Sequence, residues 1–177
     1  MSELVVLVDE QNSEIGTADK NIIHTADTPL HRGFSLFLFN SKKELLLTKR
    51  AKNKKTFPGV WTNTVCGHPG PGENVVNAAK RRLKDELGIR LGSISIQEIT
   101  PYRYRFTDVN GVVENEICPI LVAYAEIEPK FNFDEIDDWK WISWNEFLED
   151  IKKNSQAYSP WSVEEAHILQ KLDIFNR

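Results

Sequence analysis

The segment from Asn74 to Leu87 places the strongest constraint on the fold, because its apolar residues follow a helical period. These residues are Val75, Val76, Ala78, Ala79, Leu83 and Leu87. Charged residues fill the other positions, and Gly88 supplies a C-terminal stop. A helix with one apolar stripe has to bury that stripe against a second layer. The segment therefore predicts a layered domain with this helix on one face.

Short runs rich in apolar, aromatic and β-branched residues predict strands on both sides of this helix. The predicted strands are Leu4–Val8, Phe34–Phe39, Glu44–Lys49, Val60–Cys66, Ser95–Ile99, Tyr102–Thr107 and Val112–Tyr124. Pro119 predicts an interruption in the last of them. Asn40–Lys43 and Asp108–Gly111 are typical hairpin connections. The sheet is therefore predicted to be mostly antiparallel.

Two further helices are predicted near the C-terminus, at Trp144–Lys153 and Ser159–Leu172. Pro160 in a first-turn position and a possible capping box at Ser162–Glu165 mark the start of the second. No repeat, linker or composition break divides the 177 residues. We therefore expect one α+β domain over residues 1–177, with a mixed, mostly antiparallel sheet sandwiched between helices.

Composition narrows the class of function. Two isolated cysteines, Cys66 and Cys118, favour a reducing cytoplasm over a secreted disulfide scaffold. The longest apolar stretch, Ile117–Ala125, is too short to span a membrane. The net charge is −4, yet residues 42–55 contain seven basic residues and one acid. This distribution suits a small anionic ligand better than a nucleic acid.

Two tripeptides have the period that places alternate side chains on one face of a strand. In Cys66-Gly67-His68 this face carries a thiol and an imidazole, and glycine permits close approach of a ligand to the backbone. In Glu114-Asn115-Glu116 it carries two carboxylates, which must repel each other or bind a cation. Taken alone, the two glutamates could also lie on a strand face exposed to solvent. Cys66 alone could also be a small buried apolar side chain.

Three histidines extend this set. His24 and His31 bracket a six-residue segment that could form a loop and bring both imidazoles to one ion. With His68, Glu114 and Glu116 they form a mixed nitrogen and oxygen set suited to Zn²⁺, Mn²⁺ or Mg²⁺. Any one of these histidines could instead be an ordinary surface residue that binds no metal.

Basic residues near these candidates could bind phosphate. Arg50, Lys54 and Lys55 precede the Cys66 strand, and Lys20 precedes His24. A solvated basic loop is the alternative interpretation. Glu86 lies in the last turn of the central helix beside several charged residues. A charged helix face exposed to solvent would explain Glu86 without any function.

The central helix and the residues before it resemble a degenerate Nudix box. Gly67 is followed after five residues by Glu73, and after seven more by Arg81 and the run Arg82-Leu83-Lys84-Asp85-Glu86-Leu87-Gly88-Ile89. Arg82 and Asp85 replace two glutamates of the usual pattern. The resemblance implies a Nudix-like fold and weakens the case for a Nudix-type diphosphate hydrolase.

Further segments, together with this box, closely resemble type I isopentenyl-diphosphate isomerases over nearly the whole chain. They are His24–His31, Phe57–Pro69, Tyr102–Arg105, Glu114–Pro119 and Ser159–Trp161. The chain length and the lack of a transit extension resemble the bacterial members. The resemblance implies interconversion of isopentenyl and dimethylallyl diphosphate through a tertiary carbocation, without flavin.

The resemblance also implies roles for individual residues. Cys66 and Glu116 would exchange protons with the isoprenoid from opposite sides, Tyr104 would assist Glu116, and Trp161 would close the pocket and face the cation. A divalent metal (Mn²⁺, Zn²⁺ or Mg²⁺) would be held by His24, His31, His68, Glu114 and Glu116.

The diphosphate end of the substrate would have its own ligands. A second ion, Mg²⁺, would arrive with the diphosphate and contact Glu86 and the backbone near Cys66. Lys20, Arg50, Lys54 and Arg82 would neutralise the remaining phosphate charge. The expected partner is thus an isoprenoid diphosphate, with no nucleic acid or membrane, and the expected state is a monomer or weak homodimer. The rivals are a diphosphate hydrolase and a noncatalytic metal- or diphosphate-binding protein.

Overall fold

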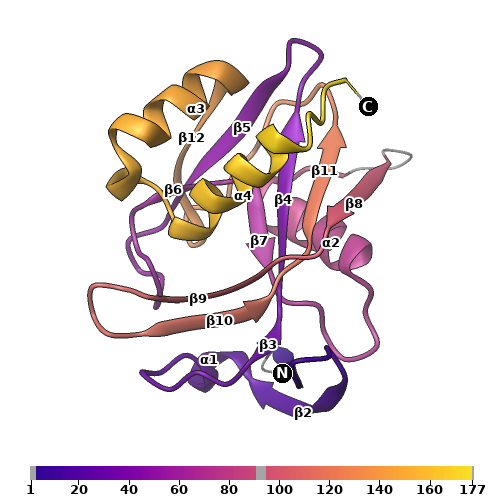
Figure 1. Cartoon of the computed structure of the whole chain (residues 1–177), viewed down its shortest axis with the longest axis vertical. Helices are drawn as coiled ribbons and strands as arrows, with labels where there is room; N and C mark the ends of the chain where they lie inside the picture. The colour runs from indigo at the N-terminus through magenta and orange to yellow at the C-terminus, as the bar shows by residue number, and fades with distance from the viewer. Residues whose placement is uncertain (1–2, 91–94, 177) are drawn as a thin grey trace.

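Strands arranged in two sheets form the frame of the protein (Figure 1). The computed structural model describes residues 3–90 and 95–176. The strands are β1 (Leu4–Val8), β2 (Glu14–Asp19), β3 (His31–Arg32), β4 (Phe34–Phe39), β5 (Glu44–Arg50), β6 (Trp61–Thr62), β7 (Val65–Gly67), β8 (Ile96–Thr100), β9 (Arg103–Thr107), β10 (Val113–Ile117), β11 (Ile120–Tyr124) and β12 (Ile136–Ser143). The helices are α1 (Lys20–Ile23), α2 (Val75–Leu87), α3 (Trp144–Lys153), the 3₁₀ helix η1 (Ser155–Ala157) and α4 (Pro160–Lys171).

The five-stranded sheet has the order β2-β1-β3-β10-β9. The seven-stranded sheet has the order β12-β5-β4-β11-β8, with β6 paired to β5 and β7 to β4. Two pairs, β3 with β10 and β4 with β11, are parallel, and the other paired strands are antiparallel. The prediction of a mixed, mostly antiparallel sheet is confirmed, although the strands divide into two sheets.

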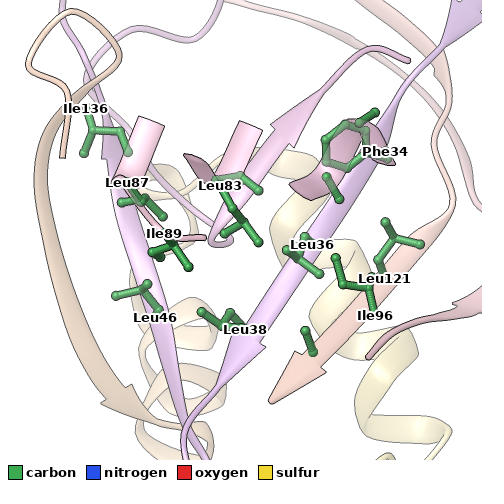
Figure 2. Close-up of a cluster of buried hydrophobic side chains, with 14 residues drawn as sticks. Phe34, Leu36, Leu38, Leu46, Leu83, Leu87, Ile89, Ile96, Leu121 and Ile136 are labelled. Carbon is green, nitrogen blue, oxygen red and sulfur yellow. The ribbon is translucent and has the colours of Figure 1, made fainter. Parts of the chain in front are cut away.

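Alternation along β4 explains why helices cover both faces of the seven-stranded sheet. Phe34, Leu36 and Leu38 pack into the cluster under α2, which Figure 2 shows from inside. Phe37 and Phe39 belong to a second cluster, which includes residues of α3 and α4. All five side chains are buried. The prediction of an α+β fold with the sheet between helices is therefore confirmed.

The two sheets meet where the chain crosses twice from one to the other. Gly33 separates β3 from β4, and Cys118-Pro119 separates β10 from β11. The backbone amide of Gly33 donates to the Ile117 carbonyl across 2.9 Å, which holds the two crossings side by side. The predicted strand Val112–Tyr124 is thus two strands, interrupted as Pro119 indicated.

Other boundaries differ from the prediction for local reasons. The predicted strand Val60–Cys66 is divided into β6 and β7, because the Asn63 side chain donates to the Leu36 and Val65 carbonyls between them. The capping box expected at Ser162–Glu165 is wrong. Ser162 lies inside α4, and its hydroxyl donates to the Ser159 carbonyl.

Several short or polar elements were not predicted from the sequence. These are β2, β3, β12 and α1. A capping box does occur, at the start of α3, where Ser143 and Glu146 cap each other. Among the described residues, no helix is both long enough and apolar enough to cross a membrane.

Candidate active site

Five predicted metal ligands gather where the two sheets meet. His24 follows α1, His31 begins β3, His68 follows β7, and Glu114 and Glu116 lie on β10. Each side chain offers one ligand atom, and these atoms all lie within 4.8 Å of one another. All five residues are buried, each exposing 7% or less of its surface. The interpretation of the glutamate pair as a solvated strand face is therefore wrong.

The donor atoms of this cluster fit a divalent cation. The Nε2 atoms of His24 and His31 and the Oε2 atom of Glu114 are buried without a hydrogen-bond partner among the described residues. His31 turns its Nδ1 toward the Pro29 carbonyl at 2.9 Å and its Nε2 toward the cluster. Burial lowers the pKa of His68 to about 4, so this imidazole is neutral, as a metal ligand must be. Three imidazoles and two carboxylates suit Zn²⁺, Mn²⁺ or Mg²⁺.

Glu116 lies at the centre of the cluster, close to the Gly33 backbone and to two histidines. A Cβ atom at Gly33 would lie 1.7 Å from Glu116 Oε2, so a side chain at this position would force the carboxylate to move. Glu116 Oε1 lies 3.1 Å from His68 Nε2 and 3.6 Å from His31 Nε2. Burial alone would raise the pKa of Glu116, but its contacts with His31 and His68 hold it well below the usual range. Glu116 is therefore a carboxylate in the metal-free protein.

Cys66 faces the same cavity from β7 and has the opposite protonation state. Its thiol donates to Asn63 Oδ1 across 2.9 Å, and its Sγ accepts a hydrogen bond from Trp161 Nε1 at 3.3 Å. Burial raises the pKa of Cys66 to about 12. The cavity is therefore lined by one thiol that keeps its proton and one carboxyl group that has lost its proton.

Aromatic side chains form one wall of this cavity. The Tyr104 and Trp161 rings stack with centroids 5.7 Å apart and planes at 15°, and the Phe57 ring meets Trp161 edge-on at 5.1 Å. Tyr104 lies opposite Glu116 in the pairing of β9 with β10. Burial raises the pKa of Tyr104 well above its ordinary value, so the phenol keeps its proton. The wall thus combines π faces with one hydroxyl donor.

The predicted phosphate-binding residues line the same cavity. Lys20, Arg50, Lys54, Lys55 and Arg82 all contribute to it, so the solvated basic loop is not the arrangement found. Most of these cations already have partners. Lys20 Nζ bonds to Glu3 Oε2 at 2.7 Å, and Arg50 donates to the Thr56 and Phe57 carbonyls.

The Nudix-like helix contributes Arg82 and Glu86 to this end of the cavity. Arg82 donates from Nε to Glu86 Oε1 at 2.7 Å, and both side chains are buried. Gly67 was expected to admit a ligand, but it is the Arg82 stem that approaches, 3.0 Å from where a Cβ atom would lie. Arg81 instead binds Glu73 and the His68 carbonyl, and so supports the loop that carries His68.

Three polar residues near the cavity were not predicted from the sequence. Asn63 orients the Cys66 thiol, Thr56 donates to Glu114 Oε1, and Glu135 pairs with Lys54 and Arg82. Asn63 lies within Phe57–Pro69, one of the segments that resemble the isomerase family. A polar side chain three residues before Cys66 in that segment could have been considered as a partner of the thiol. Glu135 gave no local signal, because its partners lie far away in the sequence.

Comparison with known proteins agrees with this geometry. The NUDIX domain model matches residues 29–162. An "Isopentenyl-diphosphate Delta-isomerase" of Corynebacterium glutamicum is 46% identical over 169 residues, which cover 92% of this chain and 88% of that protein. The chain belongs to the isopentenyl-diphosphate delta-isomerase family. Other members include proteins of the same name from Escherichia coli (45% identity, 93% and 90% covered) and Mycolicibacterium vanbaalenii (42%, 99% and 96%).

Solved structures from other organisms share this fold. A crystal structure from Deinococcus radiodurans superposes with a TM-score of 0.76 at 20% identity, covering 93% of this chain and 98% of that one. A C. elegans Ap4A hydrolase has a TM-score of 0.53 at 22% identity, covering 81% and 97%. At these identities the likeness concerns the fold alone, so the isomerase assignment depends on the sequence relatives.

Proposed function

We propose that this protein interconverts isopentenyl diphosphate and dimethylallyl diphosphate. The observation that carries the proposal is that the Cys66 thiol and the Glu116 carboxyl group line one cavity, where Glu116 belongs to the cluster of candidate metal ligands. An allylic isomerisation needs one group that gives a proton and another that takes one. Cations at one end of the same cavity match the diphosphate.

The reaction moves protons without changing the composition of the substrate. A proton adds to the terminal carbon of the alkene, the neighbouring carbon becomes a tertiary carbocation, and a proton leaves the adjacent CH₂ group to form the new double bond. Cys66 and Glu116 exchange these protons from opposite sides, and their roles reverse in the reverse reaction. Tyr104, with a phenol that keeps its proton, assists beside Glu116.

The aromatic wall protects the carbocation. Trp161 exposes only 2% of its surface, and its stacking on Tyr104 leaves little room for water on that side. Aromatic π faces attract positive charge, so the developing carbocation is stabilised where water would otherwise capture it.

Two metal sites are part of the proposal. The cluster of His24, His31, His68, Glu114 and Glu116 would hold Mn²⁺, Zn²⁺ or Mg²⁺, and an ion bound there would orient the Glu116 carboxylate and tune its acidity. Glu86 and the Cys66 backbone would hold a Mg²⁺ that enters with the diphosphate. Lys20, Arg50, Lys54 and Arg82 neutralise the phosphate oxygens.

The proposed compartment is the cytoplasm, since Cys66 and Cys118 are both free thiols.

The function is tested by incubating the metal-loaded protein with isopentenyl diphosphate and separating the products. We expect dimethylallyl diphosphate and no release of phosphate. Phosphate release without dimethylallyl diphosphate would instead assign a Nudix-type hydrolase.

A further inference from the structure

Glu135 places a carboxylate among the cations of the cavity. Its Oε2 atom accepts hydrogen bonds from Lys54 Nζ and, at 2.9 Å, from Arg82 Nη2. Its backbone is fixed at both ends: its amide donates to the Asn132 carbonyl at 3.0 Å, and its carbonyl accepts from the Ala51 amide at 3.1 Å. The side chain is 25% exposed and lines the cavity. Glu135 is therefore held where an anionic ligand would meet these two cations.

Glu135 carries its charge in this position. Burial would raise the pKa of Glu135, but the charges of Arg82 and Lys54 lower it below its ordinary value. Lys54 and Arg82 are also two of the four cations proposed to bind the diphosphate. A phosphate oxygen and the Glu135 carboxylate therefore compete for the same N–H donors.

On the basis of the function proposed above, we propose that Glu135 is an internal competitor of the diphosphate for Lys54 and Arg82. Before substrate binds, its carboxylate holds both cations at the cavity. The phosphate oxygens then displace it from one or both. Glu135 is a specificity-determining residue in this account, because it weakens the binding of bare anions and limits retention of the diphosphate product.

A purely supporting role for Glu135 predicts the opposite effect on affinity. If the carboxylate only kept Lys54 and Arg82 in position, its removal would disorder both side chains and weaken anion binding. If it competes, its removal leaves Lys54 without its ion-pair partner and Arg82 paired with Glu86 alone, and an anionic ligand gains the attraction that Glu135 took up. Unit charges at contact distance interact strongly where water is partly excluded, so the gain exceeds the ordering cost of two side chains.

The experiment measures binding of inorganic diphosphate by titration calorimetry in the presence of a chelator. Glu135→Gln keeps a hydrogen-bond acceptor and removes the charge, and we expect ~10-fold tighter binding than wild type, the scale of one partly screened charge contact. The matched control is Asp134→Asn, which makes the same change of net charge at an exposed neighbour that forms no ion pair among the described residues. This control should bind diphosphate as the wild type does.

Unchanged or weaker binding by Glu135→Gln would overturn the proposal, and so would equal tightening in the Asp134→Asn control. If Glu135→Gln does not fold, Glu135→Ala removes the same charge and has to show the same tightening. The measurement needs no isomerase activity. Failure to convert isopentenyl diphosphate would therefore refute the proposed function, whereas unaltered diphosphate affinity would refute the competitor role.

Discussion

The indole Nε1 of Trp161 donates a hydrogen bond to the Cys66 thiol across 3.3 Å. Trp161 lies in the first turn of the C-terminal helix α4, whereas Cys66 lies on β7, 95 residues earlier in the chain. The residue that closes the aromatic wall therefore also orients the thiol. Asn63 Oδ1 accepts a hydrogen bond from the thiol, and the Ser35 hydroxyl lies 3.7 Å from the same sulfur, so three polar groups fix its direction.

Trp161→Phe should separate the two roles of this side chain. Phenylalanine keeps an aromatic face beside Tyr104 but has no N–H to give Cys66, and its π face attracts a carbocation less strongly than indole does. We expect kcat to fall by ~10-fold while KM stays near the wild-type value, since a cation–π contact contributes about 1–2 kcal/mol in a dry site. An increase in KM alone, with kcat unchanged, would mean that Trp161 only shapes the pocket.

Cys66→Ala should abolish turnover while leaving diphosphate binding close to wild type. The thiol is assigned to proton transfer, and no predicted phosphate contact involves its side chain. Cys118→Ala is the matched control, because Cys118 is buried and shares the Ser35 hydroxyl with Cys66, at 3.5 Å and 3.7 Å respectively. Kinetics and calorimetry on both variants decide the point. Equal loss of activity in the two would make Cys66 a packing residue.

Glu116→Gln and Glu114→Gln should lose activity for different reasons. Glu116 is assigned both metal binding and proton transfer, whereas Glu114 is assigned metal binding alone. In Glu116→Gln we expect metal to remain at least partly bound and turnover to fall ~100-fold or more, the scale of a lost acid or base. In Glu114→Gln we expect weaker metal binding and partial recovery of turnover in excess metal.

The readout for these two variants combines bound metal, turnover and thermal stability. Because a ligand that binds only the folded state stabilises it, added metal should raise the Tm of the wild type and should raise that of Glu114→Gln only at higher metal concentration. Near-complete recovery of Glu116→Gln turnover at saturating metal would leave Glu116 as a ligand only. The proton-transfer role would then pass to Tyr104 or a bound water.

Glu165 gives a prediction about stability and pH. Its side chain is fully buried, its Oε2 has no hydrogen-bond partner among the described residues, and Cys118 Sγ lies 4.0 Å from its Oε1. Burial, reinforced by the charges of Glu116 and Glu164, raises the pKa of Glu165 well above its ordinary value of 4.5. The folded protein therefore keeps this carboxyl group neutral at pH values where the unfolded chain ionises it.

The sign of the effect follows from this difference. Below pH 4.5 the Glu165 carboxyl group is protonated in both the folded and the unfolded protein, so its ionisation does not affect stability. Above pH 4.5 and up to the pKa in the folded protein, each pH unit lowers the free energy of unfolding by about 1.4 kcal/mol. Glu165→Gln removes this cost, so its stability relative to the wild type should increase as the pH rises above 4.5. Urea unfolding at several pH values measures the difference. A difference that does not change with pH would show that Glu165 is ionised in the folded protein.

Much of the fold could be predicted because local patterns agreed with tertiary structure. The apolar run Phe34–Phe39 is a buried strand, and the helical stripe before Gly88 is the buried face of α2. Strand β3 could not be predicted, since it has two residues and depends on pairing with β1 and β10. Tertiary partners, rather than propensity, make it a strand.

Some residues of the candidate site could also be predicted from a local pattern, whereas others could not. The alternation in Glu114-Asn115-Glu116 predicted two carboxylates on one face, and the structure places both in the histidine cluster. Glu135 could not be found from the sequence, because it lies 81 residues from Lys54 and 53 from Arg82. Only the fold brings these charges together.

The proposed proton exchange is tested most directly in deuterated water. The metal-loaded wild type is incubated with isopentenyl diphosphate, and the product is followed by NMR. We predict dimethylallyl diphosphate that carries deuterium in a methyl group, because the donor that protonates the alkene exchanges with solvent before it reacts. Cys66→Ala and Glu116→Gln should form little or no labelled product over the same time. Dimethylallyl diphosphate formed at the wild-type rate by both variants would contradict the assignment of proton transfer to Cys66 and Glu116.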